Sequence, residues 1–98
     1  MVEVNFMNLY FYLSQSLLGF VTDNIRAISF KFKNEHLQLY VYLANEESDL
    51  EKENMFSVLS ETESVFSNKF NYNVTFIVKK DKLTQENKFD SWLFMRYE

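Results

Sequence analysis

Apolar residues near the N-terminus recur every three or four positions, which is the spacing of a helix with one buried face. These residues are Phe6, Tyr10, Leu13, Leu17 and Phe20. The spacing predicts a helix over about residues 3–19, and Gly19 is able to adopt the left-handed conformation that closes a helix C-terminus. The aromatic stretch 9–13 is also compatible with a strand.

From residue 24 the hydrophobic period changes to two, which is typical of strands with one buried face. In the first such segment, the apolar Ile28, Phe30 and Phe32 alternate with the polar Ser29, Lys31 and Lys33. In the second, the aliphatic Leu37, Leu39, Val41 and Leu43 alternate with Gln38, Tyr40 and Tyr42. Asn34 and Glu35 favour a turn between them, so we expect a hairpin with its aliphatic and Phe side toward the core.

A second helix is predicted over about residues 49–67. Ser48 and Glu51 have the spacing of a capping box, in which each side chain satisfies a free backbone amide of the other residue. The acids that follow suit the positive end of the helix dipole. The apolar stripe that identifies the buried face consists of Met55, Leu59, Thr62 and Phe66, flanked by Val58 and Val65.

Two more strands complete the pattern. Residues 70–78 alternate again, residues 81–87 form a polar connector, and Trp92 lies in a final strand of mixed facing. The order α-β-β-α-β-β predicts an α+β two-layer sandwich, in which a mainly antiparallel four-stranded sheet carries two helices on one face. The other face is expected to be open to solvent, with outward positions Ser29, Lys31, Tyr40, Tyr42, Asn73 and Thr75.

The composition supports a single domain over residues 1–98. The chain is 47% hydrophobic and holds eleven Phe and six Tyr, which supply a large core, while one Gly and no Pro leave no linker. The absence of cysteine excludes disulfides and thiolate zinc sites. Residues 1–19 lack the basic start of a signal peptide and carry Glu3. We therefore expect a core helix of a cytoplasmic protein with no membrane partner.

Charge is distributed unevenly along the chain. The net charge is −4, but residues 46–63 hold seven acids and one base, whereas residues 1–45 are neutral and residues 64–98 sum to +2. A concentrated negative field disfavours nucleic acid as a partner, because binding it depends on Lys and Arg at the phosphates. The same field suits a basic protein partner.

Catalytic and metal chemistry find little support in the sequence. The single histidine, His36, falls in the predicted turn without a nucleophile to activate. One Gly is too few for a phosphate-binding loop. The series Glu47, Asp49, Glu51 and Glu53 lacks the Gly and the final Glu of a calcium loop. We predict a protein that is not an enzyme and has neither a cofactor nor a metal site.

Two groups of residues have both a structural and a functional interpretation. The acidic segment, with Glu46, Glu47, Asp49, Glu51 and Glu53, is either a solvated helix start or an interaction surface. Tyr40 and Tyr42 either pack across strands or anchor a partner, since Tyr is enriched at binding hot spots.

The chain resembles the immunity proteins of bacterial toxin systems, which neutralise colicins and contact-dependent growth inhibition toxins. The resemblance rests on the small size, the α-β-β-α-β-β order and the acidic stretch from Glu46 to Glu51. It implies a cognate toxin, typically a basic nuclease, bound in the cytoplasm and blocked at or near its active site. The contacts expected from it are Glu46, Glu47, Asp49, Glu51 and Glu53, with Tyr40 and Tyr42 as apolar anchors.

Two alternatives remain open at this point. One is a small homo-oligomeric structural domain, such as a homodimer that pairs through the open sheet face and buries Tyr40 and Tyr42 symmetrically. The mass of the isolated protein in solution separates this alternative from an inhibitor. The other is a small-ligand pocket between helices and sheet, lined by Trp92 and the Phe cluster.

Overall fold

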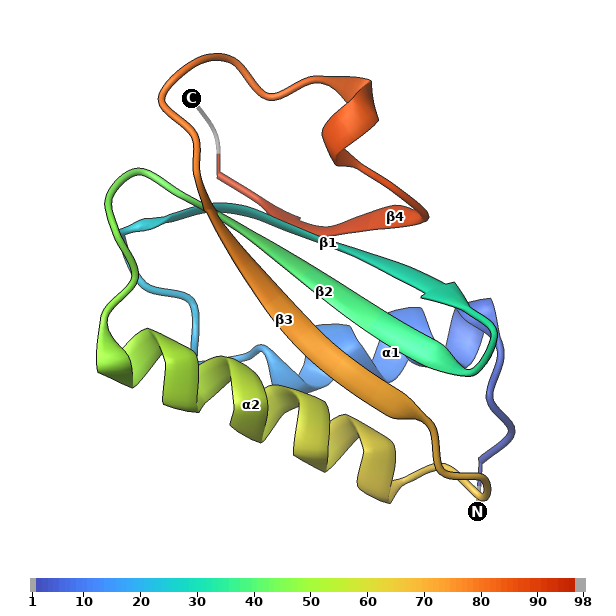
Figure 1. Cartoon of the computed structure of the whole chain (residues 1–98). Helices are drawn as coiled ribbons and strands as arrows, with labels where there is room; N and C mark the ends of the chain where they lie inside the picture. The colour runs from blue at the N-terminus through green and yellow to red at the C-terminus, as the bar shows by residue number, and fades with distance from the viewer. Residues whose placement is uncertain (1, 97–98) are drawn as a thin grey trace.

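The computed structural model describes residues 2–96. Its elements are α1 (Phe6–Ser16), β1 (Ile25–Lys33), β2 (His36–Leu43), α2 (Asp49–Ser64), β3 (Asn71–Val78), the short 3-10 helix η1 (Gln85–Asn87) and β4 (Ser91–Met95). The predicted order is confirmed, and both helices lie on one face of a four-stranded sheet (Figure 1). Within residues 2–96, no helix has the length and hydropathy needed to cross a membrane.

Local sequence signals set the ends of both helices. The Asn5 side chain caps α1 by accepting a hydrogen bond from the Asn8 amide (2.9 Å), so α1 starts later than predicted. Gly19 has a φ of +87° just beyond the helix, as expected. At the start of α2, Ser48 and Glu51 form the predicted capping box.

The sheet has the strand order β3-β2-β1-β4. β1 pairs antiparallel with β2 and with β4, whereas β2 and β3 are parallel over their whole length. The sheet is mixed: the predicted mainly antiparallel arrangement holds for two of the three pairings, and the parallel pairing of β2 with β3 was not predicted. α2 crosses the helix-covered face and returns the chain in the same direction, which is how parallel neighbours are joined.

The hairpin between β1 and β2 turns in two residues. Asn34 and Glu35 have φ values of 53° and 60°, the conformation of a type I′ turn. This turn matches the strand twist and pairs Lys33 with His36. Farther along, Arg26 is the extra residue of a β-bulge, since Ile25 pairs with Leu43 and Ala27 with Tyr42.

The core fills the space between the helices and the sheet. Its fully buried members come from both helices, from β1 and β2, and from the loop after α2. They include Leu9, Leu13, Ile28, Phe30, Leu37, Leu39, Val41, Met55, Leu59 and Phe66. The alternating aliphatic and Phe positions of β1 and β2 thus face the core as predicted.

The opposite face of the sheet is partly covered, which corrects the prediction of an open face. Residues 79–90, here called the connector, cross above this face between β3 and β4 (Figure 1). Ser29 and Tyr42 are both buried beneath it and both donate hydrogen bonds to the Asn87 carbonyl (2.9 Å each). A polar connector was expected from the sequence, but alternation within strands contains no information about what crosses over them.

The remainder of the outer face is open. Lys31, Asn73 and Thr75 are exposed there, as predicted. Trp92 also lies on this face, with its ring 6.0 Å from that of Tyr42, rather than between helices and sheet as the ligand-pocket alternative required. A register shift at Leu93 accounts for the mixed facing of β4, because it lets Phe94 join the core while Trp92 points outward.

Candidate functional site

Four of the predicted contact residues gather at one end of the sandwich. Glu46 and Glu47 lie in the loop between β2 and α2, and Asp49 and Glu53 lie in the first turns of α2. Asp23, in the loop before β1, lines the same hollow as Glu46. We call this group the acidic end: Asp23, Glu46, Glu47, Asp49 and Glu53.

Pairing of β1 with β2 explains why Asp23 joins the group. Sequence analysis did not identify it, although a signal was present. In a hairpin that turns at residues 34–35, positions equally distant from the turn lie opposite each other. The bulge at Arg26 shifts this count by one residue, so that Ile25 pairs with Leu43, and the strand pairing brings residue 23 beside the loop that contains Asn45 and Glu46.

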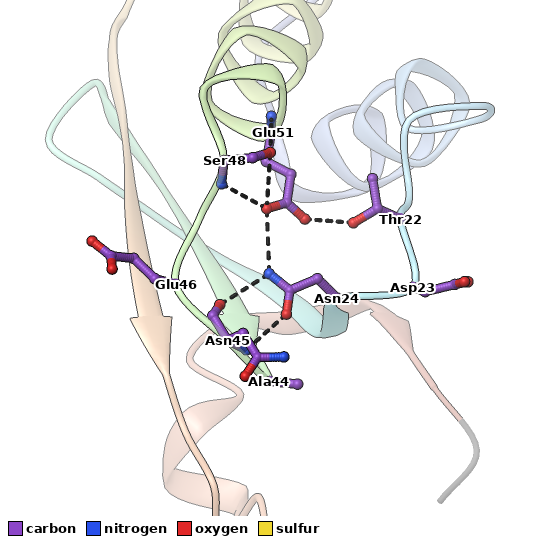
Figure 2. Close-up of a pocket in the computed structure, with 8 residues that line it drawn as sticks. All are labelled: Thr22, Asp23, Asn24, Ala44, Asn45, Glu46, Ser48 and Glu51. Atoms are coloured by element: carbon purple, nitrogen blue, oxygen red, sulfur yellow. Dashed lines mark hydrogen bonds between the residues drawn. The ribbon is translucent and has the colours of Figure 1, made fainter.

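A hollow of about 530 Å³ separates the two loops. Figure 2 shows the Asp23 and Glu46 side chains pointing away from each other on its two sides. Its interior is a hydrogen-bond network, in which Asn24 donates to the Asn45 carbonyl (2.9 Å) and accepts from the Asn45 amide (2.7 Å). These bonds hold the two loops together, so the acids at the rim stand on a fixed support.

Glu51 belongs to this network and not to the surface. Its side chain is 4% exposed and accepts hydrogen bonds from the Thr22 hydroxyl (2.5 Å), the Ser48 amide (2.9 Å) and the Asn24 amide group (3.3 Å). Burial alone raises the pKa of the Glu51 carboxyl, but these hydrogen bonds outweigh it and hold the pKa below its usual value. The predicted contact Glu51 is thus an internal brace between α2 and the loop before β1.

The other acids at this end are free to act on a partner. Among the described residues, Asp49 forms one long ion pair with Lys52 (4.0 Å), and Asp23, Glu46, Glu47 and Glu53 form none. An exposed pair at that distance contributes little. The helix N-terminus stabilises the Asp49 carboxylate, because the dipole favours anions there. The arrangement therefore presents a group of carboxyl side chains at one end of the protein.

The two predicted tyrosine anchors lie elsewhere. Tyr42 is 1% exposed under the connector, where burial raises the pKa of its phenol although hydrogen bonds with Ser29 and Asn87 act in the opposite direction. Tyr40 is half-buried and stacks on Phe89, with ring centroids 3.9 Å apart. It lines a second hollow of about 350 Å³, together with Lys31 and Lys33. The structure does not bring the tyrosines and the acids together.

Metal binding and the single histidine are the other candidates for chemistry in the part of the chain that the structure describes. Residues 2–96 contain no group of three His, Cys, Asp or Glu side chains placed to hold a metal ion. His36 begins β2, and its Nε2 lies 3.0 Å from the Asn73 side-chain oxygen. The arrangement at the acidic end is suited to attracting and binding cationic groups.

Comparison with known proteins gives the family of this chain. No curated protein matches the sequence. A family model described as MafI2 immunity protein matches residues 7–98, from the first turn of α1 through both helices and all four strands. The match confirms the predicted resemblance to bacterial toxin immunity proteins. The chain therefore belongs to the MafI2 immunity protein family and is a toxin-neutralising immunity protein.

Proposed function

We propose that this immunity protein neutralises a basic toxin domain, of the kind that acts on nucleic acid, by binding it through the acidic end. The observation that carries the proposal is the gathering of five carboxylates at one end of the fold, four of them without an ion pair among residues 2–96. A surface built to hold phosphates is cationic. Carboxylates on a rigid support would occupy such a surface in place of the substrate.

Electrostatics gives this mode of binding a physical advantage. A cluster of like charges steers an oppositely charged partner and raises its association rate, an effect that salt weakens. Neutralisation in this scheme requires binding alone and no chemical step. We place the encounter in the cytoplasm, where the nucleic acid substrate of such a toxin lies.

The set of proposed contacts is narrower than the sequence predicted. Glu51 and Tyr42 are buried and hydrogen-bonded within the fold, so a partner would not reach them without unfolding part of it. Glu46, Glu47, Asp49 and Glu53 remain as proposed contacts, and Asp23 joins them. Tyr40 stays a predicted anchor for a partner large enough to extend onto the outer sheet face.

A charge-reversal experiment tests the proposal. The partner is the cognate toxic domain, prepared as an inactive variant, and its affinity is measured by calorimetry at low and high salt. Because Glu46 and Glu53 are exposed and make no hydrogen bond within residues 2–96, the double variant Glu46→Lys, Glu53→Lys should fold normally. We expect it to weaken binding at least ~10-fold, and high salt to weaken binding of the wild type.

The matched control is the double variant Glu61→Lys, Glu86→Lys. Both residues are exposed and outside the acidic end, and the change in net charge is the same. The affinity of this control variant for the toxic domain should stay within about twofold of the wild-type value, because the charges that it changes lie outside the acidic end. Equal losses in the two double variants, or a toxin domain that binds with salt-independent affinity, would refute the acidic end as the interface.

A further inference from the structure

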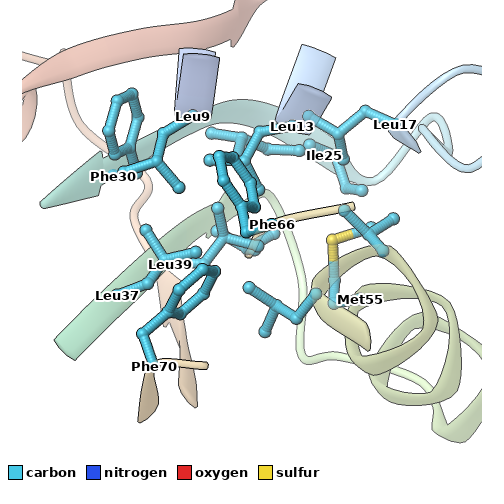
Figure 3. Close-up of a cluster of buried hydrophobic side chains, with 14 of the residues drawn as sticks. Leu9, Leu13, Leu17, Ile25, Phe30, Leu37, Leu39, Met55, Phe66 and Phe70 are labelled. Carbon is cyan, nitrogen blue, oxygen red and sulfur yellow. The ribbon is translucent and has the colours of Figure 1, made fainter. Parts of the chain in front are cut away.

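The outer surface of α1 and of the turn after it is apolar. Six large side chains of α1 and this turn are between 37% and 72% exposed, and we call them the apolar face: Phe6, Met7, Tyr10, Phe11, Leu18 and Val21. Phe6 and Tyr10 form its border toward the core, since the Phe6 ring stacks on the buried Phe30 (5.7 Å). Figure 3 shows that the other side of the same helix reaches the core through Leu9, Leu13 and Leu17. α1 is therefore hydrophobic on both sides, although only one side is buried by its own chain.

The apolar face is continuous along the helix. Met7, Phe11, Ser14 and Leu18 follow a spacing of four, three and four, so they form a single stripe on the side away from the core. Next to the stripe, Leu18 and Val21 border a groove of about 290 Å³ whose opposite wall is Leu93 and Phe94 of β4. The surface thus extends from α1 to the edge strand.

This region is also free of charge. From residue 4 to residue 22 the chain contains no acidic, basic or histidine residue. The net charge of −4 lies elsewhere, largely in residues 46–63. Two copies of the protein would approach each other through the apolar face without bringing like charges into contact, whereas an approach through the acidic end would oppose two acidic surfaces.

The area of the apolar face is sufficient for a stable pair. With about 200 Å² for a large side chain, the exposed fractions amount to roughly 600 Å² on each copy. A two-fold pair would then bury roughly 1,200 Å² in total, the lower bound for specific interfaces. Exposed apolar patches of this size on soluble proteins mark interaction sites.

We infer that the apolar face binds a second copy of this chain, giving a dimer in which two α1 helices pack across a two-fold axis. Interfaces between identical subunits are more apolar than those of transient complexes, and their centres are depleted of charge. Both properties describe this face. A basic toxin is better matched by the acidic end, whose members Glu46, Glu47, Asp49 and Glu53 come from the β2–α2 loop and α2 and not from the segment that forms the apolar face. We propose this dimer in place of the one predicted through Tyr40 and Tyr42, because the connector covers Tyr42.

Sedimentation velocity on the free full-length chain tests the dimer. We expect twice the mass of one chain, from micromolar to near-millimolar concentration and at both low and high salt, because apolar burial is insensitive to screening. Phe11→Glu should raise the dimer dissociation constant at least ~10-fold. The matched control is Phe56→Glu on α2, since Phe56 is 50% exposed and Phe11 53% exposed. It introduces the same charge and should leave the dimer intact.

Met7→Glu is a second variant for the case in which Phe11→Glu unfolds, because Met7 is 70% exposed and packs little. Far-ultraviolet circular dichroism establishes that each variant is folded. A wild-type monomer at every concentration would overturn the inference, as would a dimer that survives both α1 variants. A monomer whose α1 amides become protected only when the toxic domain is added would assign the apolar face to the toxin instead. None of these results depends on the charge-reversal experiment.

Discussion

Replacing Glu51 with Ala should be among the most damaging single substitutions in the acidic segment, although Glu51 was predicted as a surface contact. The carboxylate receives hydrogen bonds from Ser48, Thr22 and Asn24, so it joins the start of α2 to the loop before β1. Removing it leaves these donors without their protein partner.

The magnitude follows from these contacts. Ser48 remains the N-cap of α2 in this variant, and the lost bond from the Ser48 amide to the Glu51 carboxylate costs about 1 kcal/mol. A hydrogen bond to a charged group contributes about 1.5–3 kcal/mol, and the lower value applies here because Thr22 and Asn24 are half-buried. Together the losses should lower the free energy of unfolding by about 2–4 kcal/mol. For a domain of this size that corresponds to a fall in Tm of roughly 10–20 °C.

Urea unfolding followed by the fluorescence of Trp92 measures this change, since the chain contains a single Trp. The matched control is Glu53→Ala, which removes the same side chain from an exposed position two residues along α2. It should change the free energy of unfolding by less than about 0.5 kcal/mol. Equal effects of the two substitutions would show that the Glu51 hydrogen bonds do not stabilise the fold.

The pH dependence provides a second measurement of the same contact. The Glu51 pKa in the folded protein lies below its usual value, so the folded state holds the carboxylate more strongly than the unfolded state does. Its stabilisation is complete above the unfolded pKa of about 4.3 and is lost as the pH falls through the lower folded pKa. The difference in stability between wild type and Glu51→Gln should therefore shrink on acidification, and a constant difference would contradict this reasoning.

Two further predictions concern the hairpin turn and the connector. Glu35 has a φ of 60° in the hairpin turn, a conformation that glycine adopts without strain. Glu35→Gly should therefore raise the free energy of unfolding by about 0.5–1 kcal/mol in a urea titration. A lower free energy of unfolding would show that the turn is not strained. The buried Arg26 donates to the carbonyls of Lys79 (2.5 Å) and Asp81 (2.8 Å), which ties the connector to the β1 bulge. Arg26→Met removes these donors, so amide exchange in the connector should accelerate and stability fall by about 1–2 kcal/mol, and unchanged exchange would contradict that role.

Local patterns predicted the elements of this fold well. Spacing by three and four identified both helices, alternation identified the strands, and Ser48 with Glu51 marked the start of α2. These signals work because each depends on residues close together in the chain. The acidic segment was likewise visible in the sequence, since it is one run of like charges.

Site residues were predicted less completely, because burial depends on contacts between distant segments. Alternation places Tyr42 on the outer face but contains no information about the connector that covers it. Charge marks Glu51 as polar but does not reveal that Thr22 and Asn24 enclose it. Asp23 enters the acidic end only because β1 and β2 pair.

The sequence by itself determined the class of fold, the order of the elements and the concentration of negative charge, since all three follow from neighbouring residues. Tertiary structure decided that β3 runs parallel to β2, because an alternating strand presents the same two faces in either direction. It also decided which side of α1 is covered. α1 carries large apolar side chains on two sides, so only packing against the sheet shows which of them remain exposed for a partner.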